Sequence, residues 1–159
     1  QFPASLCFLY TPWKRSLAQG TEAWNTLTYK AILVNSNYMP RTRHEFMSTI
    51  TAVSGEISGI GYSAGFGGGG RIALTGASVV SVGSVIEFRV PSAAWSGISS
   101  TDRARGFVIM REAGVSDGTS PLVGFWTTCA WPVNLSNTGV TIDFASNIAI
   151  NWIDQPSSR

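Results

Sequence analysis

The sequence predicts a mostly β protein: an antiparallel β-sandwich, jelly-roll or Ig-like in connectivity, with one or two short N-terminal helices. Roughly seven segments rich in β-branched and aromatic residues recur at intervals of roughly 10–20 residues. Turns, rather than helices, separate them, which favours antiparallel over βαβ topology. The 159 residues suit one domain, and a domain of this size buries roughly 68–70% of the surface that its unfolded chain exposes.

The first twenty residues predict an extended arm followed by a helix. Residues 1–10, QFPASLCFLY, are apolar and lead to Pro12, which is tolerated only in the first turn of a helix. We therefore expect a helix over Thr11–Ala18, capped by Thr11. The arm should dock either on its own core or on a neighbouring chain. A single domain over residues 11–154 and a polar tail over 155–159 complete the organisation.

The next segment predicts a central strand, a turn and a second short helix. Leu27–Val34 is apolar on both faces, as expected of a strand inside a sheet. Pro40 cannot extend a strand ladder, and His44–Ile50 has apolar residues at helical spacing. Gly65–Gly70 satisfies GxGxxG, but no apolar strand precedes it and a β-rich segment follows. We interpret it as a flexible loop and not as a dinucleotide site.

The remaining strands alternate apolar and polar residues or are apolar throughout. Gly83-Ser84 between two of them predicts a hairpin turn. We expect these strands at Ile72–Val82 (bent at Gly76), Val85–Val90, Arg103–Glu112, Leu122–Trp131, Thr138–Phe144 and Ile148–Trp152.

The composition is poor in charge and rich in glycine and tryptophan. Charged residues make up 13% of the chain, against about 25% in an average protein. This composition is typical of a surface covered by partner subunits, or else of a neutral Ser/Thr/Asn surface. The net charge of +2 and three small basic pairs give no dense basic stripe, so we do not expect a nucleic-acid partner.

Cysteine use and the N-terminus indicate a soluble protein of a reducing cytoplasm. Cys7 and Cys129 stand far apart without zinc-site spacing, and two buried thiols are the default, with a disulfide as the alternative. The apolar arm lacks a basic n-region and a long apolar core. It therefore predicts neither a signal peptide nor a membrane span.

A search for catalytic chemistry returns nothing specific. His44 is the only histidine, lies beside Arg43, and faces no serine in a GxSxG elbow, so we expect a structural role. The nine carboxylates form no metal-binding motif. Glu87 and Asp143 could form a glycosidase pair, but both alternate with core residues and are more simply solvated. We expect no catalytic residues, no metal and no cofactor.

The six tryptophans divide into expected core and expected surface residues. The pattern places Trp126 and Trp152 inside strands and Trp13 on the apolar face of the helix. The other three fall near strand ends or loops, where an indole can stack on a sugar or anchor a protein interface. These are Trp24, Trp95 and Trp131.

A series of motifs resembles the small virion structural proteins of tailed bacteriophages. The motifs are LYTPWKRSLAQGTEAW, TYKAILVNSNYMP, HEFMSTI, the GIGYSAG turn before RIALTGASV, ARGFVIMREAG and SPLVGFW, in that order over about residues 9–126. The chain departs from that pattern in the GFGGGG loop and at Arg111-Glu112. The resemblance implies a non-enzymatic β-rich particle component, either a capsid decoration (cement) protein or a tail or fibre component. It supplies no catalytic residues.

We therefore expect a decoration protein that bridges capsid subunits in the virion, after assembly in the host bacterial cytoplasm. Its partners would be the major capsid protein and other virion subunits, and it would form a homo-oligomer, a trimer by preference. The alternative is a tail-tip or fibre module that binds a host-surface glycan or protein through Trp95 and Trp131. The expected interface residues are Phe2, Leu6, Phe8, Tyr10, Arg41, Arg43, Trp95 and Trp131.

Overall fold

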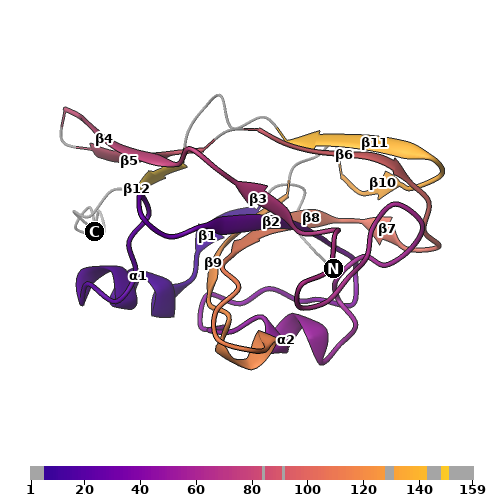
Figure 1. The fold of residues 1–159 in the computed structure, drawn as a ribbon, viewed down its shortest axis with the longest axis horizontal. Coiled ribbons are helices and arrows are strands. Elements are labelled where there is room, and N and C mark those ends of the chain that lie inside the picture. The colour runs from indigo at the N-terminus through magenta and orange to yellow at the C-terminus, as the bar shows by residue number, and fades with distance from the viewer. Residues whose placement is uncertain (1–5, 84, 91, 128–130, 143–147, 151–159) are drawn as a thin grey trace, which may run out of the picture.

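The computed structural model describes residues 6–83, 85–90, 92–127, 131–142 and 148–150. The described chain is mostly β, and all of its paired strands are antiparallel, as the sequence predicts. Figure 1 shows a curved sheet in the middle of the molecule, longer ribbons above it, and the helices below and to one side. None of the described helices is long and apolar enough to cross a membrane.

The central sheet has five strands in the order β1-β9-β8-β2-β3. Their bounds are β1 Leu6–Leu9, β9 Leu122–Thr127, β8 Gly106–Met110, β2 Tyr29–Val34 and β3 Ile72–Leu74. β2 lies between β8 and β3 and is almost entirely buried, which confirms the prediction of an inner strand.

The two faces of β2 pack into two separate core clusters. Ala31 and Leu33 belong to a large cluster rich in tryptophan, whereas Ile32 and Val34 belong to a smaller cluster beneath the sheet. Because successive side chains in a strand point to opposite faces, a strand that is apolar at every position requires cover on both sides. The layers above and below the central sheet supply that cover.

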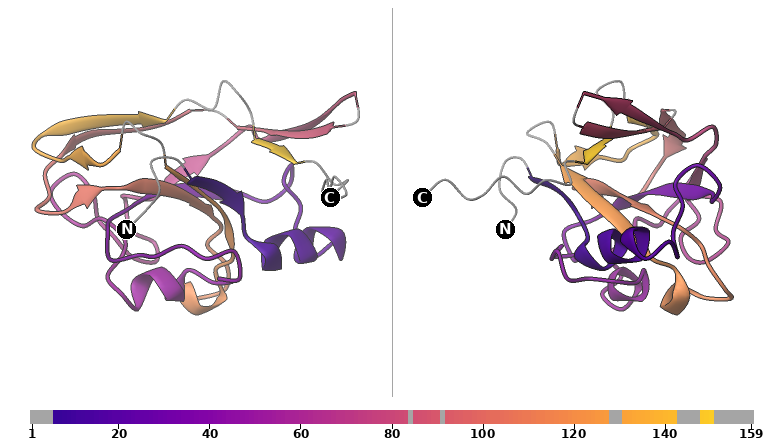
Figure 2. Two further views of the ribbon diagram at one scale, coloured as in Figure 1. Left: turned by 180° about the vertical axis from the view of Figure 1, so that it is seen from behind. Right: turned by 90° about the vertical axis from the view of Figure 1, so that its left-hand side faces the viewer.

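The remaining strands form three smaller sheets, and β4, β5, β6 and β11 lie above the central sheet in Figures 1 and 2. Their strands are β4 Ser78–Val82, β5 Val85–Arg89 and β12 Ile148–Ile150; β6 Ala93–Ile98 and β11 Thr138–Ile142; β7 Arg103–Ala104 and β10 Val133–Asn134. β4 and β5 pair as a hairpin on either side of the expected turn, of which Gly83 is described and Ser84 lies outside the described residues. These sheets do not close over the central sheet into a single sandwich, so that part of the prediction does not hold.

The expected bent strand over Ile72–Val82 is two strands in different sheets. Gly76 has φ +81°, a left-handed conformation that glycine adopts without steric cost, and the chain leaves the central sheet there. The strand that contains Trp95 was not predicted. Trp95 lies inside β6 rather than at a strand end or in a loop.

The helices are short. α1 spans Thr11–Ala18 as predicted, with Pro12 in its first turn, but the capping position is Tyr10 and not Thr11. α2 spans only Ser48–Thr51, so the expected helix over His44–Ile50 is wrong over its first four residues. A 3₁₀ turn, η1, spans Asp117–Thr119.

Candidate functional site

The N-terminal arm docks on its own sheet from Leu6 onward. β1 pairs with β9, and the ring of Phe8 lies 6.0 Å from that of Phe125 and 5.2 Å from that of Tyr10. Tyr10 is fully buried, so it contributes nothing to an exposed interface, contrary to our expectation. Phe2 lies outside the described residues. Of the two alternatives for the arm, its described part takes the first.

A chain of hydrogen bonds holds the end of this arm. The Tyr10 hydroxyl lies 2.7 Å from the Tyr38 hydroxyl, which lies 2.9 Å from Nδ1 of His44. Burial raises the pKa of Tyr38 to about 12. Burial also lowers the pKa of His44, and the charges of Arg43 and Arg41 lower it further. The hydrogen bond between the Tyr38 hydroxyl and Nδ1 of His44 joins the imidazole to the end of the arm, and the structural role expected of His44 stays a prediction.

Arg41 and Arg43 lie beside the end of the arm and are exposed. Between them, the Thr42 carbonyl accepts a hydrogen bond of 2.8 Å from the backbone N–H of Thr11. The structure therefore brings this arginine pair next to the start of α1, where both side chains face solvent.

The expected surface tryptophans are largely internal. Trp95 is only 5% exposed, its Nε1 donates to the Gly70 carbonyl at 2.6 Å, and its ring stacks on Tyr62. Trp24 is buried as well, whereas Trp131 is half-buried against the core. Because Trp95 has no open face, it cannot stack on a sugar or anchor a partner chain, and its assignment as an interface residue was wrong.

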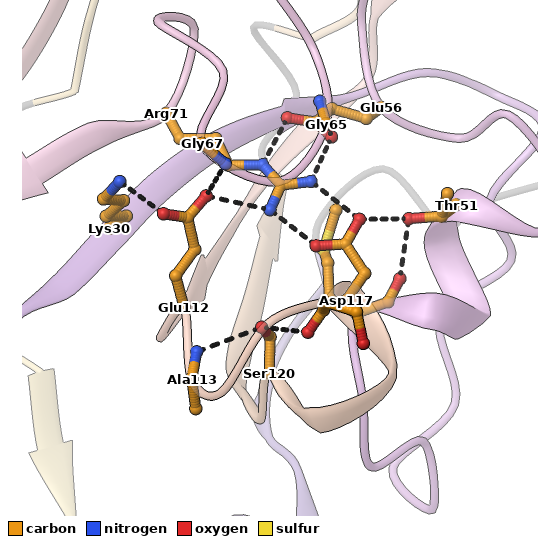
Figure 3. A network of polar contacts seen from close by, with 12 residues as sticks. Lys30, Thr51, Glu56, Gly65, Gly67, Arg71, Glu112, Ala113, Asp117 and Ser120 are labelled. Atoms are coloured by element: carbon orange, nitrogen blue, oxygen red, sulfur yellow. Dashed lines mark hydrogen bonds and ion pairs between the residues drawn. The ribbon is translucent and has the colours of Figure 1, made fainter.

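A buried cluster of charges around Arg71 is the main feature that the sequence did not reveal (Figure 3). The guanidinium has no exposed surface and makes paired hydrogen bonds of 2.7 and 3.0 Å to each of Glu56 and Asp117. Its Nη1 also donates to Glu112 at 3.2 Å, and Glu112 in turn pairs with Lys30 at 2.6 Å. Three carboxylates thus surround one arginine.

The electrostatics of the cluster favour the charged forms of Arg71, Asp117 and Glu112. Burial alone would raise the pKa of Asp117, but hydrogen bonds from Arg71 and Thr51 outweigh burial and hold that pKa below its ordinary value. The pKa of Glu112 is lowered in the same way, with Lys30 as the main partner. Burial disfavours the charged guanidinium of Arg71, yet its carboxylate partners raise its pKa overall.

The same cluster anchors the glycine-rich loop over residues 63–70. The backbone N–H of Gly65 donates to Glu56 at 3.1 Å, and that of Gly67 donates to Glu112 at 2.8 Å. A second loop, over residues 113–116, leads into η1, whose Asp117 bonds to Arg71 and to Thr51 at 2.7 Å. Hydrogen bonds therefore hold the glycine-rich segment in place, and its backbone N–H groups donate to carboxylates of the same chain.

Each of the two anchored loops exposes an apolar side chain. Phe66 is 42% exposed and Val115 is 89% exposed. We call these two residues, with the loops that carry them, the anchored-loop surface. Loops that a rigid scaffold positions often carry binding residues.

A second ion pair and a cavity lie beside α1. The Arg111 guanidinium donates hydrogen bonds to the carboxylate of Glu22. The same carboxylate accepts a hydrogen bond from the Tyr29 hydroxyl, with 2.6 Å between the two oxygens. The adjacent cavity of about 250 Å³ is lined by both members of that pair and by Glu45 and Phe46. Glu45 is itself paired with Arg15, so the charges around the cavity cancel in pairs.

Metal chemistry finds no support in the described residues, where no group of three or more His, Cys, Asp or Glu could hold an ion. Cys7, expected to be buried, is exposed and free on the edge strand β1. Cys129, Asp143, Trp152 and residues 155–159 lie outside the described residues. Comparisons with known protein families, with curated proteins and with solved structures found no match.

Sequence reasoning missed the Arg71 cluster because its members are far apart in the chain. Arg71 is 15 positions from Glu56 and 46 positions from Asp117. One signal was present: an arginine stands between a glycine run and an apolar strand in a chain that carries little charge. That signal marks Arg71 as unusual but does not identify its partners.

Proposed function

We propose that this chain is a non-enzymatic structural protein of a tailed-bacteriophage virion, a capsid decoration protein that stabilises the head by bridging capsid subunits. Its partners are the major capsid protein and other virion subunits. The order of motifs shared with phage virion proteins supports this assignment. Those motifs include the segments that form β2, β8 and β9, the inner strands of the central sheet.

The observation that carries the proposal is that the buried ion pairs around Arg71 hold two surface loops in place. A buried ion-pair cluster adds little net stability over an apolar core, but it fixes the groups that it joins. Here Arg71 joins Glu56 from one segment to Asp117 from another, and both loops of the anchored-loop surface are held in place. A surface that is ordered before binding loses less conformational entropy when a partner docks.

In this proposal the anchored-loop surface buries Phe66 and Val115 against a capsid subunit. A few well-packed side chains carry most of the binding energy in protein interfaces, and arginine is frequent among them. Arg41 and Arg43 form a second contact region, next to the start of α1. Two contact regions on one chain are what bridging between neighbouring capsid subunits requires.

The test is binding to phage heads that lack this protein. Purified chain is mixed with such heads, and the bound fraction is measured by sedimentation of the particles. The double variant Phe66→Ser/Val115→Ser should bind at least about tenfold more weakly, because two exposed apolar anchors are lost. A matched control is Val79→Ser/Val82→Ser on the β4–β5 hairpin, where the side chains are 43% and 47% exposed.

The result decides the proposal in either direction. If the anchored-loop variant, the hairpin control and the wild type occupy phage heads equally, the anchored-loop surface does not contact the capsid. If the wild type does not bind heads but competes with infection of host cells, the chain is instead a tail-tip or fibre module. In that alternative Trp131 would be the binding residue, because Trp95 is buried.

A further inference from the structure

The outer edge of β1 offers backbone groups that no described residue uses. β1 lies at the edge of the central sheet (Figure 2, right), and β9 is its only partner among the described strands. The backbone N–H of Tyr10 donates to the Val123 carbonyl at 2.9 Å, and Leu9 lies opposite Gly124. Tyr10 and Val123 therefore form a hydrogen-bonded pair. Because hydrogen-bonded and non-hydrogen-bonded pairs alternate along an antiparallel ladder, the next pair, Leu9 and Gly124, exchanges no hydrogen bonds.

The alternation along the ladder then fixes the direction of every group in β1. Phe8 bonds to β9, whereas the N–H and C=O groups of Cys7 and Leu9 point away from it. The backbone N–H and C=O groups of Cys7 and Leu9 make no hydrogen bond to any other described segment. Two donors and two acceptors therefore line the open edge.

In the part of the chain that the structure describes, this edge lacks the features that normally prevent strands from pairing between molecules. Natural sheets protect their edges with charged side chains, proline, bulges or covering loops. β1 has the sequence LCFL, without charge or proline, and its register with β9 runs without a bulge. The Cys7 side chain is exposed. Among the described residues, only the far end of this edge is covered, where the N–H of Thr11 bonds to Thr42.

We propose that a second copy of this chain pairs with β1, antiparallel and about a two-fold axis at Phe8. In this register Cys7 of each copy lies opposite Leu9 of the other. The pairing satisfies all of the outward N–H and C=O groups of Cys7 and Leu9 in both copies at once. The uncharged strand brings no like charges together, and the two Phe8 side chains meet across the axis, where aromatic pairs are favourable.

This pairing closes with two copies, because one edge that pairs with itself makes an isologous contact. It therefore predicts a dimer and not the trimer that the resemblance to phage proteins led us to expect. The pairing uses neither Phe66 nor Val115, so the variants at β1 and the variants of the anchored-loop surface test the two proposals separately.

The experiment is sedimentation equilibrium of the full chain with reductant, which removes any disulfide between copies. At about 0.1 mM the wild type should sediment with twice its mass of 17.0 kDa. Cys7→Pro removes one outward N–H in each copy without touching a bond to β9. It should raise the dissociation constant about 30-fold, the equivalent of about 2 kcal/mol.

Two further variants complete the test. Cys7→Ser keeps the backbone N–H and should remain dimeric, whereas Cys7→Lys places a charge on the edge of each copy and should be monomeric. Far-ultraviolet circular dichroism and urea unfolding show whether each variant is folded. If Cys7→Pro does not fold, the oligomeric state of Cys7→Lys decides whether the dimer forms through β1. A monomeric or trimeric wild type, or a dimer unaffected by Cys7→Lys, would overturn the proposal.

Discussion

Replacing Arg71 by methionine tests whether the buried charge cluster holds the fold together. The substitution leaves Glu56 and Asp117 buried without their cation. Breaking a buried ion pair from one side costs about 3–5 kcal/mol. The ordinary pKa of an aspartate is 3.8, so protonating Asp117 at pH 7 costs about 4 kcal/mol, in agreement with that range. The loss is a large share of the roughly 5–15 kcal/mol that stabilises a domain.

The assay is urea unfolding of both proteins between pH 7 and pH 4. The wild-type Asp117 has a lowered pKa, so its contribution is present above pH 4 and is lost only as the pH falls through the folded-state pKa. In Arg71→Met, burial without the cation raises the pKa of that carboxyl. The variant therefore gains stability as the pH falls toward 4, and the difference between the two proteins should narrow.

The matched control is Arg15→Met, which removes an exposed ion pair with Glu45 and should cost no more than about 1 kcal/mol. The reasoning would be refuted if Arg71→Met cost as little as this control at pH 7. It would also be refuted if the difference from wild type did not change between pH 7 and pH 4.

Two further predictions concern single positions. A Cβ at Gly70 would lie 2.3 Å from the ring of Tyr62, whereas one at Gly69 would meet nothing within 4 Å, so Gly70→Ala should destabilise by about 1–3 kcal/mol and Gly69→Ala by much less in urea unfolding. Because the pKa of His44 is lowered on folding, the unfolded chain binds more protons below about pH 6.5, and the wild type should lose stability as the pH falls from 7.5 to 5.5. His44→Gln should lack that part of the loss, and an identical pH dependence in the variant would contradict the assignment.

Elements with a strong local signal could be predicted from the sequence. Pro12 restricts where a helix can begin, and α1 begins where that restriction places it. The doubly apolar pattern of Leu27–Val34 requires burial on both faces, and β2 lies inside the sheet. In both cases the information resides in a few adjacent residues.

Elements that depend on distant partners could not be predicted. β6 has the sequence AAWSGI, in which small residues hide the alternation and Gly97 interrupts it at φ +61°. Its strand character comes from pairing with β11, where Val140 lies opposite Trp95 although it follows much later in the chain. Trp95 is buried for the same reason. The Arg71 cluster likewise forms only when the loops around Glu56 and Asp117 come together, and no local pattern encodes that meeting.

A density map of the intact phage particle tests the proposed function most directly. The proposal predicts copies of this domain on the outer face of the head, recognisable by the five-stranded sheet, with Phe66 and Val115 against a capsid subunit. Density for the domain at the tail tip, or a particle that contains no copy of it, would contradict the proposal.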